Sequence, residues 1–236
     1  MIPLRDINPT QRFPVVSVAI IAVNALIFIL TSGQLEDAVT RYGAVAFHYS
    51  GAEPSVIRAP DGLIPPVDDD GRRVLRALTH MWLHGGWLHI LGNMWFVWVF
   101  GDNVEDRLGR FRYLVLYFAS GAAALASQIL ADPAYGQPMI GASGAVSGVL
   151  GAYVVLFPRA HVLTLIPLGW IFLTAVWPAF VFLGIWFGIQ ILQGSLGPDG
   201  AGGVAWWAHA GGFIAGMLLA WPLAQPQRAM RRLPRD

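Results

Sequence analysis

Long apolar runs, separated by short polar or glycine-rich segments, dominate the pattern of this chain. Several runs exceed the ~18 residues that a helix needs to cross the hydrocarbon layer of a membrane. Run length and flanking helix breakers predict six transmembrane helices, with ends defined to within several residues. They are expected at Pro14–Leu30, Leu83–Phe100, Tyr113–Leu130, Met139–Phe157, Thr174–Leu192 and Val204–Leu223.

The predicted fold class is an all-α membrane protein, a six-transmembrane-helix bundle with a long first extracytoplasmic loop. A single domain is expected, made of an N-terminal segment 1–13, the bundle 14–223 and a tail 224–236. Within the long loop, Glu53–Arg73 is rich in proline, glycine and aspartate and is predicted to be a surface excursion.

The segment Val162–Leu173 is apolar as well, but it contains Pro167 and Gly169 and is short for a crossing. It is predicted to lie at the membrane interface or to lead into the fifth span. A crossing here would give seven spans and reverse the topology of everything after it.

Composition agrees with a membrane protein, because 56% of residues are apolar and only 12% are charged. The 15 basic residues are all arginines, and no run of them is dense enough to track a phosphate backbone. Nucleic acid is therefore not an expected partner. The chain has no cysteine, which excludes disulfides, thiolate catalysis and zinc–cysteine sites.

Arginine placement predicts the orientation of the bundle. In a six-span topology the arginines of both terminal segments, Arg107–Arg112 and Arg159 all fall on one side of the membrane. By the positive-inside rule that side is cytoplasmic, so both termini are expected in the cytoplasm. The short termini suit a multi-pass protein of a bacterial inner (plasma) membrane.

Four polar side chains are predicted to lie at one depth. His89 and Asn93 come early in the second span, Ser143 early in the fourth and His209 early in the sixth. All three spans descend from the outer side, and Ser143 and His209, about four and five residues into their spans, are expected within ~10 Å of that surface. Buried polar groups are costly in hydrocarbon, so such residues are functional candidates.

Helical spacing predicts how these groups meet. His89 and Asn93 are four residues apart and share one helix face. Gly144-x-x-x-Gly148 and Gly212-x-x-x-Gly216 fit the small-residue pattern that lets helix backbones touch. The fourth and sixth helices are therefore expected to bring Ser143 within hydrogen-bond reach of His209.

A hydroxyl beside an imidazole indicates nucleophilic catalysis, in which neutral His209 takes the Ser143 proton as the oxygen attacks an amide carbonyl. The resulting oxyanion needs donors, each contributing ~3 kcal/mol. The Ser143 backbone N–H, the Asn93 amide and the His89 ring are candidates. No carboxylate lies near this depth in the spans, which predicts a Ser-His dyad without an orienting acid.

At these residues the chain resembles the rhomboid family of intramembrane serine proteases. The motifs, in family order over most of the chain, are His84-x-x-x-x-His89-x-x-x-Asn93, Gly101-x-x-x-Glu105-x-x-x-Gly109, Gly141-x-Ser143-Gly144 and Ala208-His209-x-x-Gly212-x-x-x-Gly216. Two positions depart from the family pattern: Leu75-Arg76 replaces Trp-Arg, and Ser147 replaces an aromatic residue.

The resemblance implies an intramembrane serine endopeptidase that cleaves transmembrane segments near their extracytoplasmic end through an acyl-enzyme. Ser143 would be the nucleophile and His209 the general base, with His89, Asn93 and the Ser143 N–H in the oxyanion hole. Supporting positions are Gly141, Gly144, His84 and Gly212. The resemblance also implies a membrane-inserted first loop and a water-filled cavity open to the outside. Expected partners are single-pass or polytopic membrane-protein substrates, entering laterally, and the lipid bilayer.

No cofactor and no metal are expected. His80 and His84 are four residues apart, but the chain lacks a His-Glu-x-x-His motif and a nearby carboxylate, so structural hydrogen bonding is predicted for both. Two other functions stay open: a non-proteolytic transporter whose buried histidines relay protons, and a rhomboid-like pseudoprotease that binds transmembrane helices. The intact Ser143 and His209 argue against the second.

Overall fold

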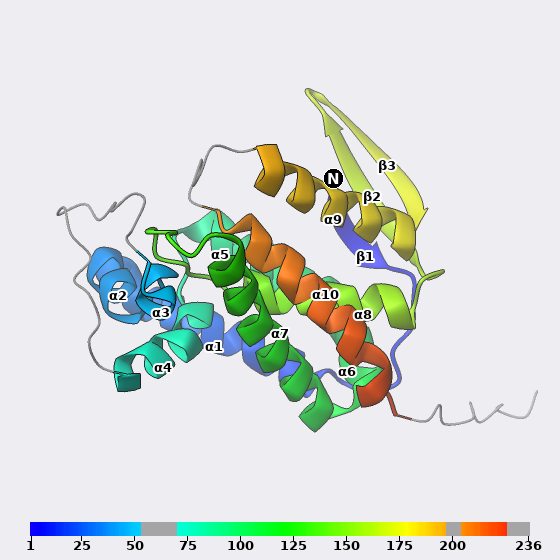
Figure 1. Ribbon diagram of the computed structural model, residues 1–236. Helices are drawn as coiled ribbons and strands as arrows, with labels where there is room; N and C mark the ends of the chain where they lie inside the picture. Colours follow the sequence, from blue (N-terminus) through cyan, green and yellow to red (C-terminus); the bar gives the residue numbers. More distant parts are fainter. Residues whose placement is uncertain (53–69, 197–203, 226–236) are drawn as a thin grey trace, which may run out of the picture.

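The computed structural model describes residues 1–52, 70–196 and 204–225, and these are mostly helical with one small sheet (Figure 1). In chain order the elements are β1 (Ile2–Asp6), α1 (Val15–Thr31), η1 (Ser32–Gln34), α2 (Leu35–Tyr42), α3 (Phe47–Ser50), α4 (Asp70–Thr79), η2 (His80–Trp82), α5 (Trp87–Phe96), η3 (Val97–Gly101), α6 (Asp102–Leu108), α7 (Arg110–Ala131), α8 (Ser143–Leu156), β2 (His161–Leu168), β3 (Ile171–Pro178), α9 (Ala179–Leu196) and α10 (Trp206–Leu223). Most of the predicted tail 224–236 and of the excursion Glu53–Arg73 lies outside the described residues.

Within the described part of the chain, three helical stretches are long and apolar enough to cross a membrane by length and composition. They are Val15–Tyr42, Arg110–Ala131 and Ala179–Leu196, and Ser143–Leu156 is a shorter apolar helix. The second predicted span becomes one continuous helical run from α5 through a π-helical turn, η3, into α6. This run ends at Gly109, whose φ of 81° lies in the left-handed region that favours glycine.

The all-α prediction is wrong in one respect, because β1, β2 and β3 form a three-stranded antiparallel sheet. Val162–Leu173, predicted to be interfacial or a lead-in, forms most of β2 and the start of β3. The fifth helix begins at Ala179 and not at Thr174. Branched and aromatic residues favour strands here, and Pro178 disfavours helical geometry at the residue before it.

Hydrogen bonds attach the N-terminal strand β1 to the helices. Asp6 Oδ2 accepts from Asn103 Nδ2 at 2.6 Å and from the Tyr153 hydroxyl at 2.7 Å. The indole of Trp95 donates to the Pro3 carbonyl oxygen at 2.5 Å. The segment 1–13, which the sequence leaves without secondary structure, is thus bound to α5, α6 and α8.

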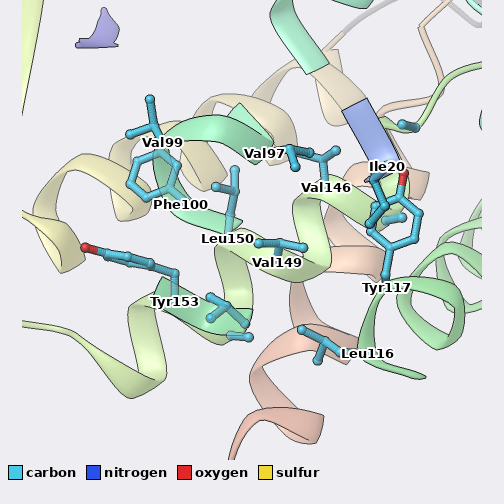
Figure 2. Packing of buried hydrophobic residues seen from close by; sticks show 14 of the residues in the cluster. Ile20, Val97, Val99, Phe100, Leu116, Tyr117, Val146, Val149, Leu150 and Tyr153 are labelled. Atoms are coloured by element: carbon cyan, nitrogen blue, oxygen red, sulfur yellow. The ribbon is translucent and has the colours of Figure 1, made fainter. Parts of the chain in front are cut away.

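The hydrophobic core surrounds α8. Figure 2 shows Val146, Val149 and Leu150 of this helix among buried side chains of α1, η3 and α7, such as Ile20, Val97 and Tyr117. Because Ser143 is the first residue of α8, the buried core around this helix holds the serine in place.

Glycines let the backbones of α8 and α10 touch. A Cβ added at Gly212 would collide with the Gly144 carbonyl oxygen, and one added at Gly216 would collide with that of Gly148. In Figure 1, α7 and α10 run side by side, and a Cβ at Gly148 would strike Ser120 of α7. The close packing predicted for the fourth and sixth helices is confirmed, and it fixes the elements that carry Ser143 and His209.

A distant carboxylate caps α1, which has no local side-chain cap. Glu105 Oε1 accepts from Val16 N at 3.0 Å, and Glu105 Oε2 accepts from Ser17 N at 2.8 Å and from Ser17 Oγ at 2.9 Å. Unpaired amides and the positive end of the helix dipole favour an anion at this position. Glu105 therefore joins α1 to α6.

Candidate active site

Ser143 is the first residue of α8, and the loop before it is tightly constrained. Gly141 has φ 113°, and its N–H donates to the His80 carbonyl oxygen at 2.9 Å. Met139 pairs with Ala44 in an isolated β-bridge, so the helix cannot begin at Met139 as the sequence pattern predicts. Ser143 thus lies at a helix N-terminus, where the dipole stabilises negative charge.

The side chains of Ser143 and His209 meet across the touching helices α8 and α10. Ser143 Oγ lies 2.8 Å from His209 Nε2. His209 is the fourth residue of α10, and both side chains are half-buried. A serine hydroxyl bonded to an imidazole is the arrangement of a nucleophile with its general base.

His89 and Asn93, from α5, border the loop before Ser143. A Cβ added at Gly141 would lie 2.6 Å from His89 Nε2 and 3.6 Å from Asn93 Nδ2. His89 Nδ1 accepts from the Gly85 N–H at 3.3 Å, so in the neutral ring Nε2 carries the proton and faces this loop. Among the described residues, no acceptor partners the buried Asn93 Nδ2. Two donors are therefore available beside Ser143.

The other predicted site residues pack around this centre. His84 is fully buried and lies edge-on to His89, with ring centroids 5.1 Å apart. Gly144 packs against Ala124 of α7, and the backbone of Gly212 contacts that of Gly144. His80 Nδ1 bonds to the Arg76 carbonyl oxygen at 3.1 Å. Over residues 1–52, 70–196 and 204–225, no three histidine or acidic side chains cluster as metal ligands would.

Other contacts compensate for the two departures from the family pattern, at Leu75-Arg76 and at Ser147. Arg76, 6% exposed, donates to the carbonyl oxygens of Thr40 at 2.7 Å and Arg41 at 3.2 Å, so the arginine holds the first loop without a preceding tryptophan. Ser147 Oγ donates to the Ser143 carbonyl oxygen at 2.6 Å. Aromatic packing on His209 comes from Trp186 of α9 instead, with ring centroids 6.3 Å apart.

Sequence reasoning missed one residue of the site, Gln190 of α9. Its Oε1 lies 2.7 Å from His209 Nδ1, and the side chain is 7% exposed. The available signal was a polar amide inside the predicted fifth span, which is costly in hydrocarbon without a partner.

A cavity of about 600 Å³ adjoins these groups, bounded by α5, α8, α9 and α10. Its lining includes Ser143, His209, His89 and Asn93 beside apolar side chains such as Phe96. A mostly apolar cavity with a few convergent polar groups is typical of a binding or catalytic site.

Comparison with known proteins assigns most of the chain to one group. A family model described as "Rhomboid domain" matches residues 71–226. The chain is 33% identical over 153 residues to RHOMBOID-like protein 7 of Arabidopsis thaliana, an alignment that covers 64% of this chain and 44% of that protein.

Two bacterial proteins align over similar lengths of the chain. Rhomboid protease GluP of Bacillus subtilis is 31% identical over 154 residues, covering 64% of this chain and 26% of GluP. Rhomboid protease GlpG of Haemophilus influenzae is 28% identical over 155 residues, covering 65% of this chain and 72% of GlpG. The alignments thus span less than half of the Arabidopsis and Bacillus proteins.

Proposed function

This chain belongs to the rhomboid family, and we propose that it is an intramembrane serine endopeptidase that cleaves transmembrane segments of membrane proteins near their extracytoplasmic end. The observation that carries the proposal is the 2.8 Å separation of Ser143 Oγ and His209 Nε2 beside a cavity in a protein of membrane-spanning helices. Relatives named rhomboid proteases, in Bacillus subtilis and Haemophilus influenzae, support the same chemistry.

In this mechanism His209 Nε2 accepts the Ser143 hydroxyl proton while Oγ attacks the scissile carbonyl carbon. The carbonyl oxygen becomes an oxyanion, which accepts hydrogen bonds from the Ser143 N–H, Asn93 Nδ2 and His89 Nε2–H. The imidazolium then gives its proton to the leaving amine, which leaves an ester on Ser143. Water, deprotonated by His209, hydrolyses that ester and restores the enzyme.

The proposed setting follows from the arginine distribution. Both termini lie in the cytoplasm of a bacterium, and the Ser143 end of the bundle faces the outer side of its inner membrane. Substrates are single-pass or polytopic membrane proteins that enter the cavity laterally from the bilayer. No cofactor is required, because the donors, nucleophile and base all belong to the chain.

The proposal is tested in liposomes that contain the purified protein and a single-span substrate, with and without a metal chelator. We expect chelator-resistant cleavage, and we expect a fluorophosphonate probe to attach to Ser143 when the labelled peptide is identified by mass spectrometry. If the probe attaches elsewhere and no substrate is cleaved, the protease proposal fails, and a transporter or a pseudoprotease becomes the favoured function. Loss of cleavage with the chelator would instead indicate a metal-dependent reaction.

Replacing Asn93 with alanine is expected to lower kcat by about 100-fold, with little change in KM, because its N–H donates mainly to the transition state. Steady-state cleavage in detergent micelles gives both constants. Probe labelling of Ser143 serves as the control that the nucleophile is still present. An unchanged kcat would remove Asn93 from the oxyanion hole.

A further inference from the structure

His209 is held from its second ring nitrogen by α9, a helix that carries neither the nucleophile nor the base. Gln190 Oε1 lies 2.7 Å from His209 Nδ1, while Ser143 Oγ lies 2.8 Å from Nε2. The imidazole is thus bonded on both sides, once by each of two neighbouring helices.

The direction of these bonds follows from the chemistry of the amide. Gln190 Nε2 donates to the Trp186 carbonyl oxygen at 3.4 Å, which leaves Oε1 as the atom facing the ring. A carbonyl oxygen only accepts, so Nδ1 of a neutral His209 must carry the proton. Nε2 then has its lone pair toward Ser143, which is the form that a general base needs.

Burial makes this bond hard to replace. Gln190 is 7% exposed in a helix that is otherwise largely apolar, so an unpaired amide here would be costly. Trp186 lies one turn before Gln190 on the same face of α9, and its ring packs near the imidazole at a centroid distance of 6.3 Å. Trp206 approaches edge-on at 5.9 Å. The ring is therefore confined on its faces as well as at Nδ1.

We propose that Gln190 is a positioning residue, a neutral third member beside Ser143 and His209 that holds His209 in its Nδ1–H tautomer and orientation. This inference deepens the proposed function and rests on it. Gln190 touches no reacting atom and acts through the imidazole. Its role corresponds to that of an orienting acid, without the cost of a buried charge.

The test compares two glutamines of α9. Gln190→Met keeps the length of the side chain and removes the hydrogen-bond acceptor. It is expected to lower kcat by about 10- to 100-fold, because base catalysis by His209 is weakened. KM is expected to stay within about twofold of the wild-type value. Gln193→Met makes the same change at an exposed position three residues further on and is expected to leave both constants unchanged. Equal kcat values for the two variants would overturn the proposal.

A second measurement reads the tautomer of His209 in the wild-type protein and does not depend on the activity of any variant. Nitrogen-15 NMR of the histidine-labelled wild-type protein, with the His209 signals identified by their loss in His209→Gln, is expected to show neutral His209 protonated at Nδ1 and bare at Nε2. In Gln190→Met the signals should move toward a mixture of tautomers. Protonation of wild-type His209 at Nε2 would overturn the proposal.

The two experiments separate this inference from the proposed function. If the wild-type protein cleaves no substrate and takes no probe at Ser143, the protease assignment fails. The tautomer of His209 still decides whether Gln190 positions it. If cleavage is normal and the tautomer is wrong, only the role of Gln190 fails.

Discussion

Replacing Ser143 with alanine is expected to lower the cleavage rate by roughly 10⁴- to 10⁶-fold, because the attacking oxygen is removed. His209→Ala should cause a loss of similar size, since a neutral hydroxyl without its base is a poor nucleophile. The double variant should be no slower than either single one, because the two groups act as a unit. Product formation in liposomes, followed by gel and mass spectrometry, measures all three rates.

Matched changes at exposed positions are the controls for these variants. Ser195→Ala on α9 and His161→Ala at the start of β2 remove the same groups at positions outside the cavity lining and should cleave like the wild type. Cleavage by Ser143→Ala at the wild-type rate would eliminate the serine protease mechanism. A double variant much slower than either single variant would show that Ser143 and His209 act independently.

Replacing Gly212 with alanine is expected to destabilise the fold by roughly 3 kcal/mol or more. The added Cβ would collide with the Gly144 carbonyl oxygen, and backbone cannot move aside as a flexible side chain would. The helices α8 and α10 must then separate, which also pulls His209 from Ser143. Thermal unfolding in detergent measures the loss of stability, and cleavage measures the damaged site.

Gly188→Ala on α9 is the control, because a Cβ at Gly188 would have nothing within 4 Å. Alanine is the better helix former, so this variant should be as stable as the wild type or slightly more so. Equal stability of Gly212→Ala and Gly188→Ala would contradict the account of the packing between α8 and α10.

The sequence predicts most of the bundle because hydrocarbon imposes simple rules. Uninterrupted apolar runs place α1, α7 and α10 well, and glycine spacing predicts that α8 and α10 touch. The sequence pattern places the start of α8 wrongly, because the β-bridge between Met139 and Ala44 is a contact between distant segments. The sheet is missed for a similar reason. The residues of β2 and β3 are so apolar that they cannot be told from the beginning of a transmembrane helix, and β2 pairs with β1, which is distant in the sequence.

Within the candidate site, the groups found from sequence are those with recognisable motifs. Ser143, His209, His89 and Asn93 all follow from motif and depth. Gln190 does not, because its function depends on where α9 lies relative to α10, and no local pattern encodes that. The effect of having Ser147 in place of an aromatic residue is also beyond the sequence, because the ring near the imidazole comes from Trp186 of a different helix, α9.

The cap on α1 bears on how the protein is made. Glu105 lies 89 positions after Val16 and 88 after Ser17, so a ribosome has delivered α1 to the membrane well before the carboxylate is synthesised. Until then the first amides of α1 bond to water or lipid headgroups at the bilayer surface. We therefore expect α1 to dock late in biogenesis, after α6 has been translated, and nascent chains that stop short of residue 105 to keep α1 inserted but loose.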